Sequence, residues 1–181
     1  MAAIAAPLTR TTPATAALRA IVTAGLCCGV LDLAAAFVAS GLKGTGPVVV
    51  LHSVAGAVLG RAAYQGGLAT AALGLAMHFC VAGALAAIFY VLSRRWVLLV
   101  RHPLPFGLLY GALAYFAMYW VVIPLCAVAR KFYLPNVTVR FLPFSFETLA
   151  IHLCCVGLPI AFAIRHFSRG AVARESDAGR R

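Results

Sequence analysis

Four long apolar runs, at about residues 18–41, 67–92, 104–128 and 145–167, limit what this chain can fold into more than any other feature of its sequence. A helix of such a length crosses roughly 30 Å of hydrocarbon at about 1.5 Å per residue. Only helices and closed barrels satisfy their backbone hydrogen bonds in lipid, and long uninterrupted apolar runs are helical. The sequence therefore predicts four transmembrane helices.

The composition supports this interpretation. Hydrophobic residues make up 64% of the chain and charged residues only 10%, whereas soluble domains are about 25% charged. Lys and Arg outnumber Asp and Glu by 15 to 4, but no basic patch is interleaved with stacking aromatic residues, which excludes a nucleic-acid partner. We therefore predict an all-α polytopic membrane helix bundle whose main partner is the lipid bilayer.

A shorter apolar segment, residues 47–63, follows the first run and is interrupted by Arg61. Its apolar part of about 13 residues is too short for a span. Four spans with both ends inside also place most basic residues on cytoplasmic flanks, and a fifth span weakens that bias. We predict a short interfacial helix here and two cytoplasmic termini, with the protein in the inner (plasma) membrane.

The two ends of the chain are predicted to be disordered cytoplasmic tails. Residues 1–17 are rich in Ala and Thr and contain Arg10 but no acid, a composition that cannot build a core. They also resemble a targeting segment, but the apolar run that follows is longer than a signal core and contains Asp32, so we expect an uncleaved first span. Residues 168–181 form a basic tail.

Small residues at four-residue spacing are frequent in the apolar segments. They allow close helix contacts in lipid, where no hydrophobic force drives helices together. The pairs are Gly25 and Gly29, Gly56 and Gly60, Gly83 and Ala87, and Gly107 and Gly111. We predict a tightly packed bundle, and these glycine faces are also candidate contacts for a homo-oligomer or a membrane-protein partner.

Asp32 lies near the middle of the first run, where a carboxylate is costly. Positions 25, 29, 32 and 36 share one helical face, so Asp32 follows the Gly25–Gly29 pair. We therefore expect this carboxyl group to face neighbouring helices rather than lipid, either hydrogen-bonded or protonated.

Four further ionisable residues complete a candidate polar site: His78, His152, His52 and Glu147. With both ends inside, Asp32 and His152 are predicted at similar depth in the outer half of the bundle. His52 belongs to the interfacial helix, Glu147 opens the fourth span, and His78 lies deeper. Ionisable groups at such depths are candidates for a proton relay or a coupling site.

Each of these residues also has a structural explanation. Glu147 follows Ser145, which can cap the helix, and an acid favours the positive helix end. The histidines can simply bond neighbouring helices. A haem or metal site is disfavoured, because the depths of His78 and His152 do not match and His78 shares no helix face with Cys80.

No cofactor, metal or catalytic residue is predicted. The six cysteines all lie in apolar segments and act as small apolar fillers: Cys27, Cys28, Cys80, Cys126, Cys154 and Cys155. The sequence has neither a nucleophile–base constellation nor a phosphate-binding loop, since "GLKGTG" lacks the required spacing and ending.

Three stretches carry a resemblance to known proteins: "GRAAYQGGLATAALGLAMHF" (60–79), "PLPFGLLYGALAYFAMYWVVIPL" (103–125) and "IHLCCVGLPIAFAIRH" (151–166). The sequence resembles a family of bacterial four-span inner-membrane proteins of unknown function over most of residues 20–167. The resemblance implies the membrane class and the topology, and it assigns no role to any residue.

Two roles remain open on the sequence alone. The favoured one is a structural or accessory membrane subunit that works by helix packing. The alternative is a small proton-coupled carrier or channel in which Asp32, His78 and His152 line the path. The small size of the chain and the lack of inverted repeats count against the carrier, and an enzyme is the least supported role.

Overall fold

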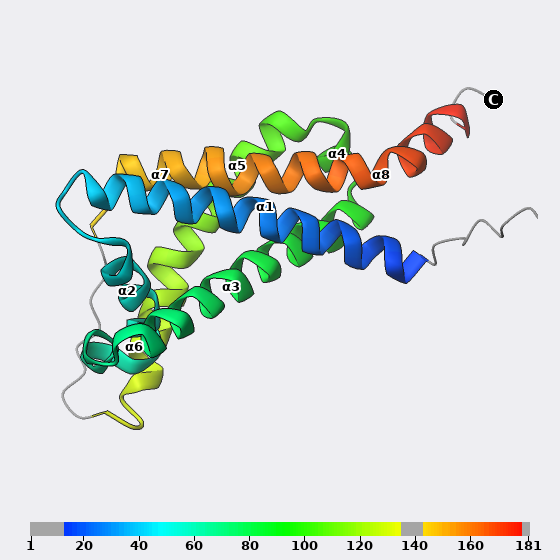
Figure 1. Ribbon diagram of the computed structural model, residues 1–181. Helices are drawn as coiled ribbons and strands as arrows, with labels where there is room; N and C mark the ends of the chain where they lie inside the picture. Colours follow the sequence, from blue (N-terminus) through cyan, green and yellow to red (C-terminus); the bar gives the residue numbers. More distant parts are fainter. Residues whose placement is uncertain (1–12, 135–142, 179–181) are drawn as a thin grey trace, which may run out of the picture.

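The computed structural model describes residues 13–134 and 143–178, and all regular secondary structure in this part of the chain is helical (Figure 1). Two of the helical segments are π-helical turns (η2, η3) and one is a 3₁₀ helix (η1). The elements are α1 (Pro13–Gly41), α2 (Pro47–Leu59), η1 (Gly60–Gln65), α3 (Gly67–Arg95), α4 (Leu98–Arg101), α5 (Pro103–Ala117), η2 (Met118–Val122), α6 (Ile123–Arg130), α7 (Phe146–Ile151), η3 (His152–Gly157) and α8 (Leu158–Ala178).

Five stretches of helix are long and apolar enough to cross a membrane: Ala14–Gly41, Pro47–Gln65, Gly67–Arg95, Pro103–Arg130 and Phe146–Ser168. Their outward faces carry large exposed apolar side chains, such as Leu26, Val30 and Leu113. A soluble protein rarely exposes so much apolar surface, and a bilayer covers it. The predicted all-α membrane bundle is therefore confirmed.

The directions of the helices distinguish α2 from the other four stretches. Gly25 of α1 lies against Gly83 of α3, and Gly29 lies against Phe79, so these two helices are antiparallel. Because α1 leaves one end of the molecule and α3 returns to it, α2 and η1 begin and end at the far end (Figure 1). The described part of the chain thus has four longer helical stretches and one shorter stretch at one end, and the shorter one is also long and apolar enough to cross a membrane.

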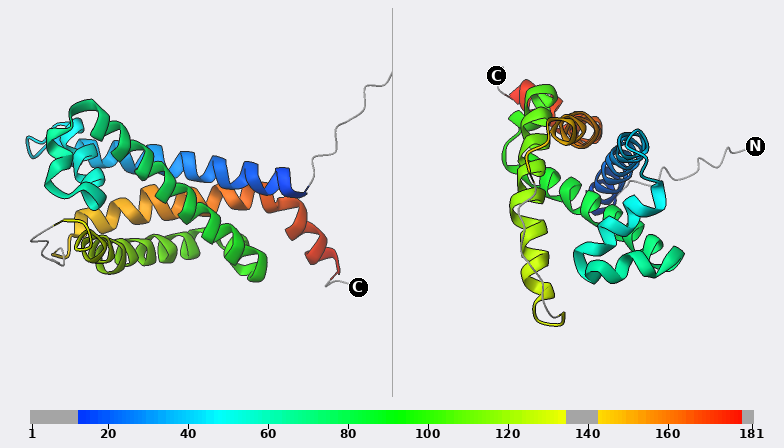
Figure 2. Two further views of the ribbon diagram at one scale, coloured as in Figure 1. Left: turned by 90° about the horizontal axis from the view of Figure 1, so that it is seen from below. Right: turned by 90° about the vertical axis from the view of Figure 1, so that its left-hand side faces the viewer.

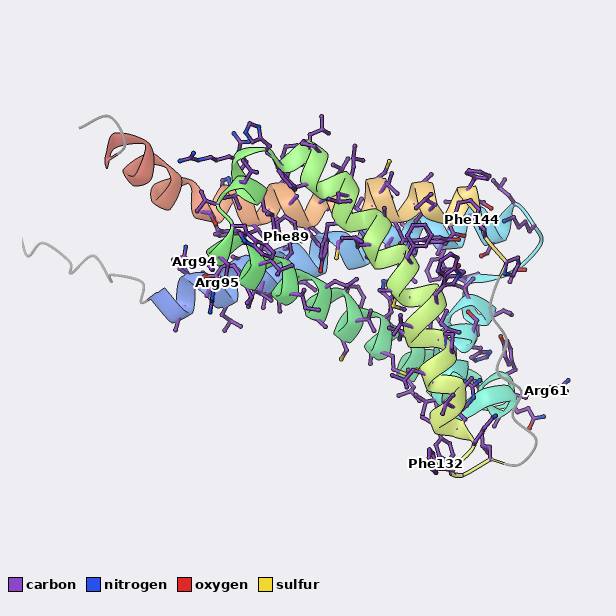
Figure 3. All side chains as sticks on the ribbon, turned by 180° about the vertical axis from the view of Figure 1, so that it is seen from behind. Arg61, Phe89, Arg94, Arg95, Phe132 and Phe144 are labelled. Atoms are coloured by element: carbon purple, nitrogen blue, oxygen red, sulfur yellow. The ribbon has the colours of Figure 1, made fainter. Side chains whose placement is uncertain are left out.

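The four long stretches form two helical hairpins that pack on each other. Seen along α1, the hairpin of α1 and α3, with α2, lies beside the hairpin of α5–α6 and α7–α8 (Figure 2). The hairpins meet tightly at the end that carries Arg94 and Arg95, and α6 diverges from α1 and α8 towards the other end (Figure 3). We call these the closed end and the open end.

The closed end contains the main core. Phe89 of α3 and Ile160 and Ile164 of α8 are fully buried there, together with small residues of α1 such as Ala24. The ring of Phe89 meets the ring of Tyr110 edge to face, with centroids 5.0 Å apart. The hydroxyl of Tyr110 donates a 2.7 Å hydrogen bond to the carbonyl of Leu85. This end is filled by rings and aliphatic side chains.

Two of the predicted glycine pairs make close helix contacts. A Cβ added to Gly25 would lie 3.0 Å from the Cα of Gly83 in α3, and one added to Gly111 would lie 2.5 Å from the carbonyl oxygen of His152. Gly157, which the sequence analysis did not select, is the tightest position in that second contact, because its Cβ would lie 2.0 Å from the carbonyl oxygen of Gly107.

The pair Gly56 and Gly60 does not pack helices together, which corrects the prediction. The nearest atom to a Cβ on Gly56 is 4.0 Å away, in the ring of Tyr64. Gly60 has φ +61°, and its amide caps the end of α2 by donating to the carbonyl of Gly56. These glycines end a helix, and four-residue spacing alone does not separate that role from a packing role.

The tails are shorter than predicted within the described residues. Residues 13–17 form the first turns of α1, because Pro13 is tolerated at a helix start and the alanines that follow favour helix. Helix α8 continues to Ala178, through most of the predicted basic tail. Residues 1–12 and 179–181 lie outside the described part of the chain.

Candidate functional site

A cavity near the open end brings together four of the five predicted site residues, three around its centre and Glu147 at its edge. Asp32 from α1, His78 from α3 and His152 from η3 line it, together with Tyr119 from η2 and Val54 from α2. It has two parts that share these five residues, an inner part of about 190 Å³ and an outer part of about 270 Å³. The site thus lies where both hairpins and α2 meet.

The inner part is apolar apart from the shared residues. Its lining adds Val81 and Leu85 from α3, and Met118 and Ile123 from the other hairpin. Beyond it lies the closed end, where the Phe89–Tyr110 contact and the bond from Tyr110 to the Leu85 carbonyl join α3 to α5. On this side the inner part is therefore closed by packed side chains.

The outer part is polar and reaches exposed residues. Ser40, Ser53 and Thr148 line it, as do Lys43 and Glu147. The ammonium of Lys43 forms an ion pair with the carboxylate of Glu147, and the two side chains are 65% and 44% exposed. A pair this exposed is a surface feature with a small free energy. The pair lies at the mouth of the cavity, and its positive and negative charges cancel.

The Asp32 side chain is half-buried between the two parts of the cavity. Among the described residues, its carboxylate accepts no hydrogen bond and forms no ion pair. It faces the cavity rather than lipid, as the sequence predicts, but the hydrogen bond that the sequence analysis considered is not formed with these residues. A charge or a donor for this carboxylate has to come from the cavity.

The two histidines of the cavity are held by carbonyl groups. His78 places Nε2 2.9 Å from the carbonyl oxygen of Gly29, and His152 places Nδ1 2.9 Å from that of Thr148. A carbonyl oxygen only accepts, so each of these nitrogens carries a hydrogen. In a neutral ring the second nitrogen, Nδ1 of His78 or Nε2 of His152, is then an acceptor.

Two π-helical turns shape the second hairpin at this depth. The amide of Ile123 donates to the carbonyl of Met118, and that of Leu158 to the carbonyl of Leu153, which are five-residue spacings. A proline, Pro124 or Pro159, stands at the second position after each turn and lacks the amide that a regular helix needs. These turns carry Tyr119 and His152 to the cavity.

His52, the fourth predicted residue, lies apart from this site. It is buried, its Nε2 lies 2.8 Å from the carbonyl oxygen of Gly67, and its ring meets that of Tyr64 edge to face. These contacts fasten α2 to the start of α3. The side chain does not line the cavity, so its role is the structural one.

Glu147, the fifth predicted residue, lies at the mouth of the cavity and in the first turn of α7. Ser145 caps this helix, because the amide of Thr148 donates to its hydroxyl oxygen at 3.2 Å. The structural explanation of Glu147 is supported by this cap, and the ion pair with Lys43 adds a contact between the two hairpins.

Sequence reasoning missed Tyr119 and the role of Lys43. Tyr119 lies in the aromatic run "YFAMYW". The one sequence signal that the helix is irregular here is Pro124, a few residues further on. Its ring packs against Tyr115, 4.7 Å between centroids, and approaches His152 at 6.4 Å. Lys43 was counted only as an orientation signal, and its partner is more than 100 residues away in the sequence.

No group of three or more His, Cys, Asp or Glu side chains in the described residues is placed to hold a metal ion. The arrangement offers instead a small chamber with an unpaired carboxylate, two imidazoles and an apolar inner wall. No protein-family model, no curated protein and no solved structure matches this chain.

Proposed function

We propose that this protein is a small membrane carrier that binds a solute in the cavity and uses Asp32 as its proton-exchanging group. The single observation that carries the proposal is the meeting of Asp32, His78 and His152, from three separate helices, around one cavity. Ionisable groups are costly at such depths and mark solute or proton paths in membrane proteins. The unpaired state of Asp32 fits a group that takes up and gives off a proton.

A carrier is favoured over a channel because, in the described residues, packed side chains close one end of the bundle. The outer part reaches the exposed pair of Lys43 and Glu147, whereas fully buried Phe89, Ile160 and Ile164 fill the closed end. A channel needs a continuous path. A carrier exposes its site to one side at a time, and the geometry fits such a one-sided state.

The helix-packing role, favoured on the sequence alone, has less support. The contacts of Gly25 with Gly83, and of Gly107 and Gly111 with Gly157, lie within the chain. The close approaches that these glycines allow are therefore used within the chain.

For the location we propose the inner (plasma) membrane, with four crossings and both termini in the cytoplasm. Arg19, Arg94 and Arg101 lie on helix ends that meet at the closed end, which suits the positive-inside rule. Reporter fusions to the two ends test this arrangement, and opposite locations of the two ends would contradict it.

Water access to the cavity tests the carrier most directly. In a variant without other cysteines, we compare Cys80 alone with a cysteine introduced by Val81→Cys. The two positions are neighbours on α3, but Cys80 is exposed on the outer face of the bundle and Val81 lines the cavity. A charged methanethiosulfonate reagent should modify position 81 at least tenfold faster than position 80 in membranes. Equal rates would show that the cavity is not an aqueous compartment.

Proton exchange by Asp32 needs its own measurement. Infrared difference spectra of the purified protein between acidic and alkaline pH should contain a carboxyl C=O band that Asp32→Asn removes. Asp32→Glu should shift the band without removing it. Identical spectra for the wild type and Asp32→Asn would contradict a proton-exchanging role while leaving the cavity intact.

A further inference from the structure

We propose that the solute is an organic ammonium ion with an apolar body, a lipophilic primary or secondary amine in its protonated form. This inference rests on the proposed function, because it concerns the occupant of the same cavity. It follows from three independent properties of the lining: its charge, its hydrogen-bonding capacity and the separation of its polar and apolar parts.

The charge of the cavity is negative at one place only. The titratable groups that face it are Cys28, Asp32 and Lys43 from α1 and its following turn, His78 from α3, Tyr119 from η2, Glu147 from α7 and His152 from η3. Lys43 and Glu147 compensate each other at the mouth. The carboxyl group of Asp32 is left without a partner among the described residues, and as a carboxylate it attracts a cation and repels an anion.

Three side chains at the centre of the cavity offer hydrogen-bond acceptors, while the hydroxyl of Tyr119 can both donate and accept. Nε2 of His78 and Nδ1 of His152 are already committed to carbonyl oxygens. The remaining ring nitrogens are lone-pair acceptors, and the Asp32 carboxylate is an acceptor too. A ligand that satisfies such a set has to bring hydrogens on a positively charged atom, as an ammonium group does. A quaternary ammonium ion brings the charge without the hydrogens.

The inner part accommodates the apolar body. Val81, Leu85 and Ile123 surround it together with Met118, whose flexible thioether side chain adapts to different shapes. A ligand with its ammonium beside Asp32 and its hydrocarbon towards the closed end matches both halves of the lining. A bare metal cation leaves the inner part unused, and the described residues place no three metal ligands together.

The proposed site also links amine release to proton uptake. When Asp32 takes up a proton, its charge is lost, and the ammonium ion leaves with its own proton. One proton is bound as one monovalent cation departs, so charge and protons balance. Bound amine and bound proton therefore exclude each other at Asp32.

The test uses the full chain in lipid nanodiscs and four probes with the same eight-carbon chain: octylammonium, octyltrimethylammonium, octanol and octanoate. Binding is followed by calorimetry at neutral pH against empty nanodiscs, which removes partition into lipid. We expect octylammonium to bind at least tenfold more tightly than octyltrimethylammonium or octanol, and octanoate not to bind. Asp32→Asn should weaken octylammonium at least tenfold and leave octanol unchanged, while Asp32→Glu should retain the preference.

The outcomes separate this inference from the proposed function. Equal affinity for octylammonium and octanol, or an equal loss of both in Asp32→Asn, would overturn the ammonium class. Tighter binding of octanoate would overturn it as well. None of these binding results affects the measurements of water access at position 81 or of the Asp32 infrared band. Those two measurements test the carrier itself. If Asp32→Asn fails to fold, the ranking of the four probes on the wild type and Asp32→Glu decides alone.

Discussion

The closed end and the open end of this bundle are built from the same helices but by different means. At the closed end, Phe89, Tyr110 and Ile164 fill the space between the hairpins, and the hydroxyl of Tyr110 is satisfied by the carbonyl of Leu85. At the open end, α2 lies beside α1 and α3, and a cavity with an unpaired carboxylate remains. One end is filled by packed side chains, and the other leaves a cavity.

The difference shows how a chain with few polar residues can still build a site. In lipid, the solvent is as apolar as the side chains, so burying them between helices gives no hydrophobic free energy. Packing and hydrogen bonds therefore hold the helices together. The closed end supplies most of that packing, and the open end can then tolerate incomplete packing. Four predictions test this division, in order of decreasing effect.

Gly157→Leu should lower the stability most, because Gly157 is in close contact with α5 and so holds the two stretches of the second hairpin together. Its Cβ would meet backbone atoms of Gly107 and Gly111 at 2.0–2.8 Å, which no side-chain movement relieves. We expect a loss of about 3 kcal/mol or more, or no folded protein at all. Thermal unfolding in detergent measures it. Gly83→Ala is the control, because a Cβ added to Gly83 would meet no atom within 4 Å. This variant should unfold as the wild type does.

Phe89→Ala and Leu85→Ala contrast the closed end with the cavity wall on one helix. Phe89 is completely buried, so its removal leaves an empty volume and should lower stability by about 2 kcal/mol, from lost packing alone. Leu85 already borders a cavity and should lose under about 1 kcal/mol. Equal losses in denaturant titrations would show that the two ends are packed alike.

Arg130→Met should affect the open end selectively. The Arg130 guanidinium donates from Nη1 to the carbonyls of Gly56 and Ala57, at 2.9 and 2.6 Å, and so satisfies the end of α2. We expect a loss of about 1–2 kcal/mol and faster hydrogen exchange in residues 50–60, with exchange around Phe89 unchanged. A uniform increase throughout the chain would instead mean that α2 and the closed end unfold together.

The ion pair of Lys43 and Glu147 should have the smallest effect. Both side chains are substantially exposed, so a double-mutant cycle with Lys43→Gln and Glu147→Gln should give a coupling below about 1 kcal/mol that falls further in high salt. A coupling of several kcal/mol, insensitive to salt, would place this pair in a dry interior rather than at a mouth.

The sequence predicts the helices of this fold well and the details of its site only in part. Long apolar runs give α1, α3 and the two later stretches, because length and hydrophobicity decide what crosses a bilayer. The shortness of the apolar segment before Arg61 predicts that α2 does not cross the membrane, which stays a prediction, because Pro47–Gln65 is also long and apolar enough to span. The face of Asp32 follows from its spacing to Gly25 and Gly29, since α1 is regular there.

Regular spacing stops being informative where a helix is irregular. The faces of Tyr119 and His152 depend on π-helical turns, which hydrophobic periodicity does not reveal. The separation of His52 from the other histidines depends on how α2 turns, which is fixed by the positive φ of Gly60 and by contacts with Arg130. Such tertiary contacts join residues that no local pattern connects.

The two wide turns have a consequence for any comparison of this chain with a relative. Each accommodates one residue more than a regular turn, and one residue corresponds to about 100° of rotation. A relative that lacks a single residue at Met118–Val122 or at His152–Gly157 would keep the lengths of its helices and their hydrophobicity. It would nevertheless present a different set of side chains to the chamber, so a one-residue gap in an alignment there would signal a change of ligand.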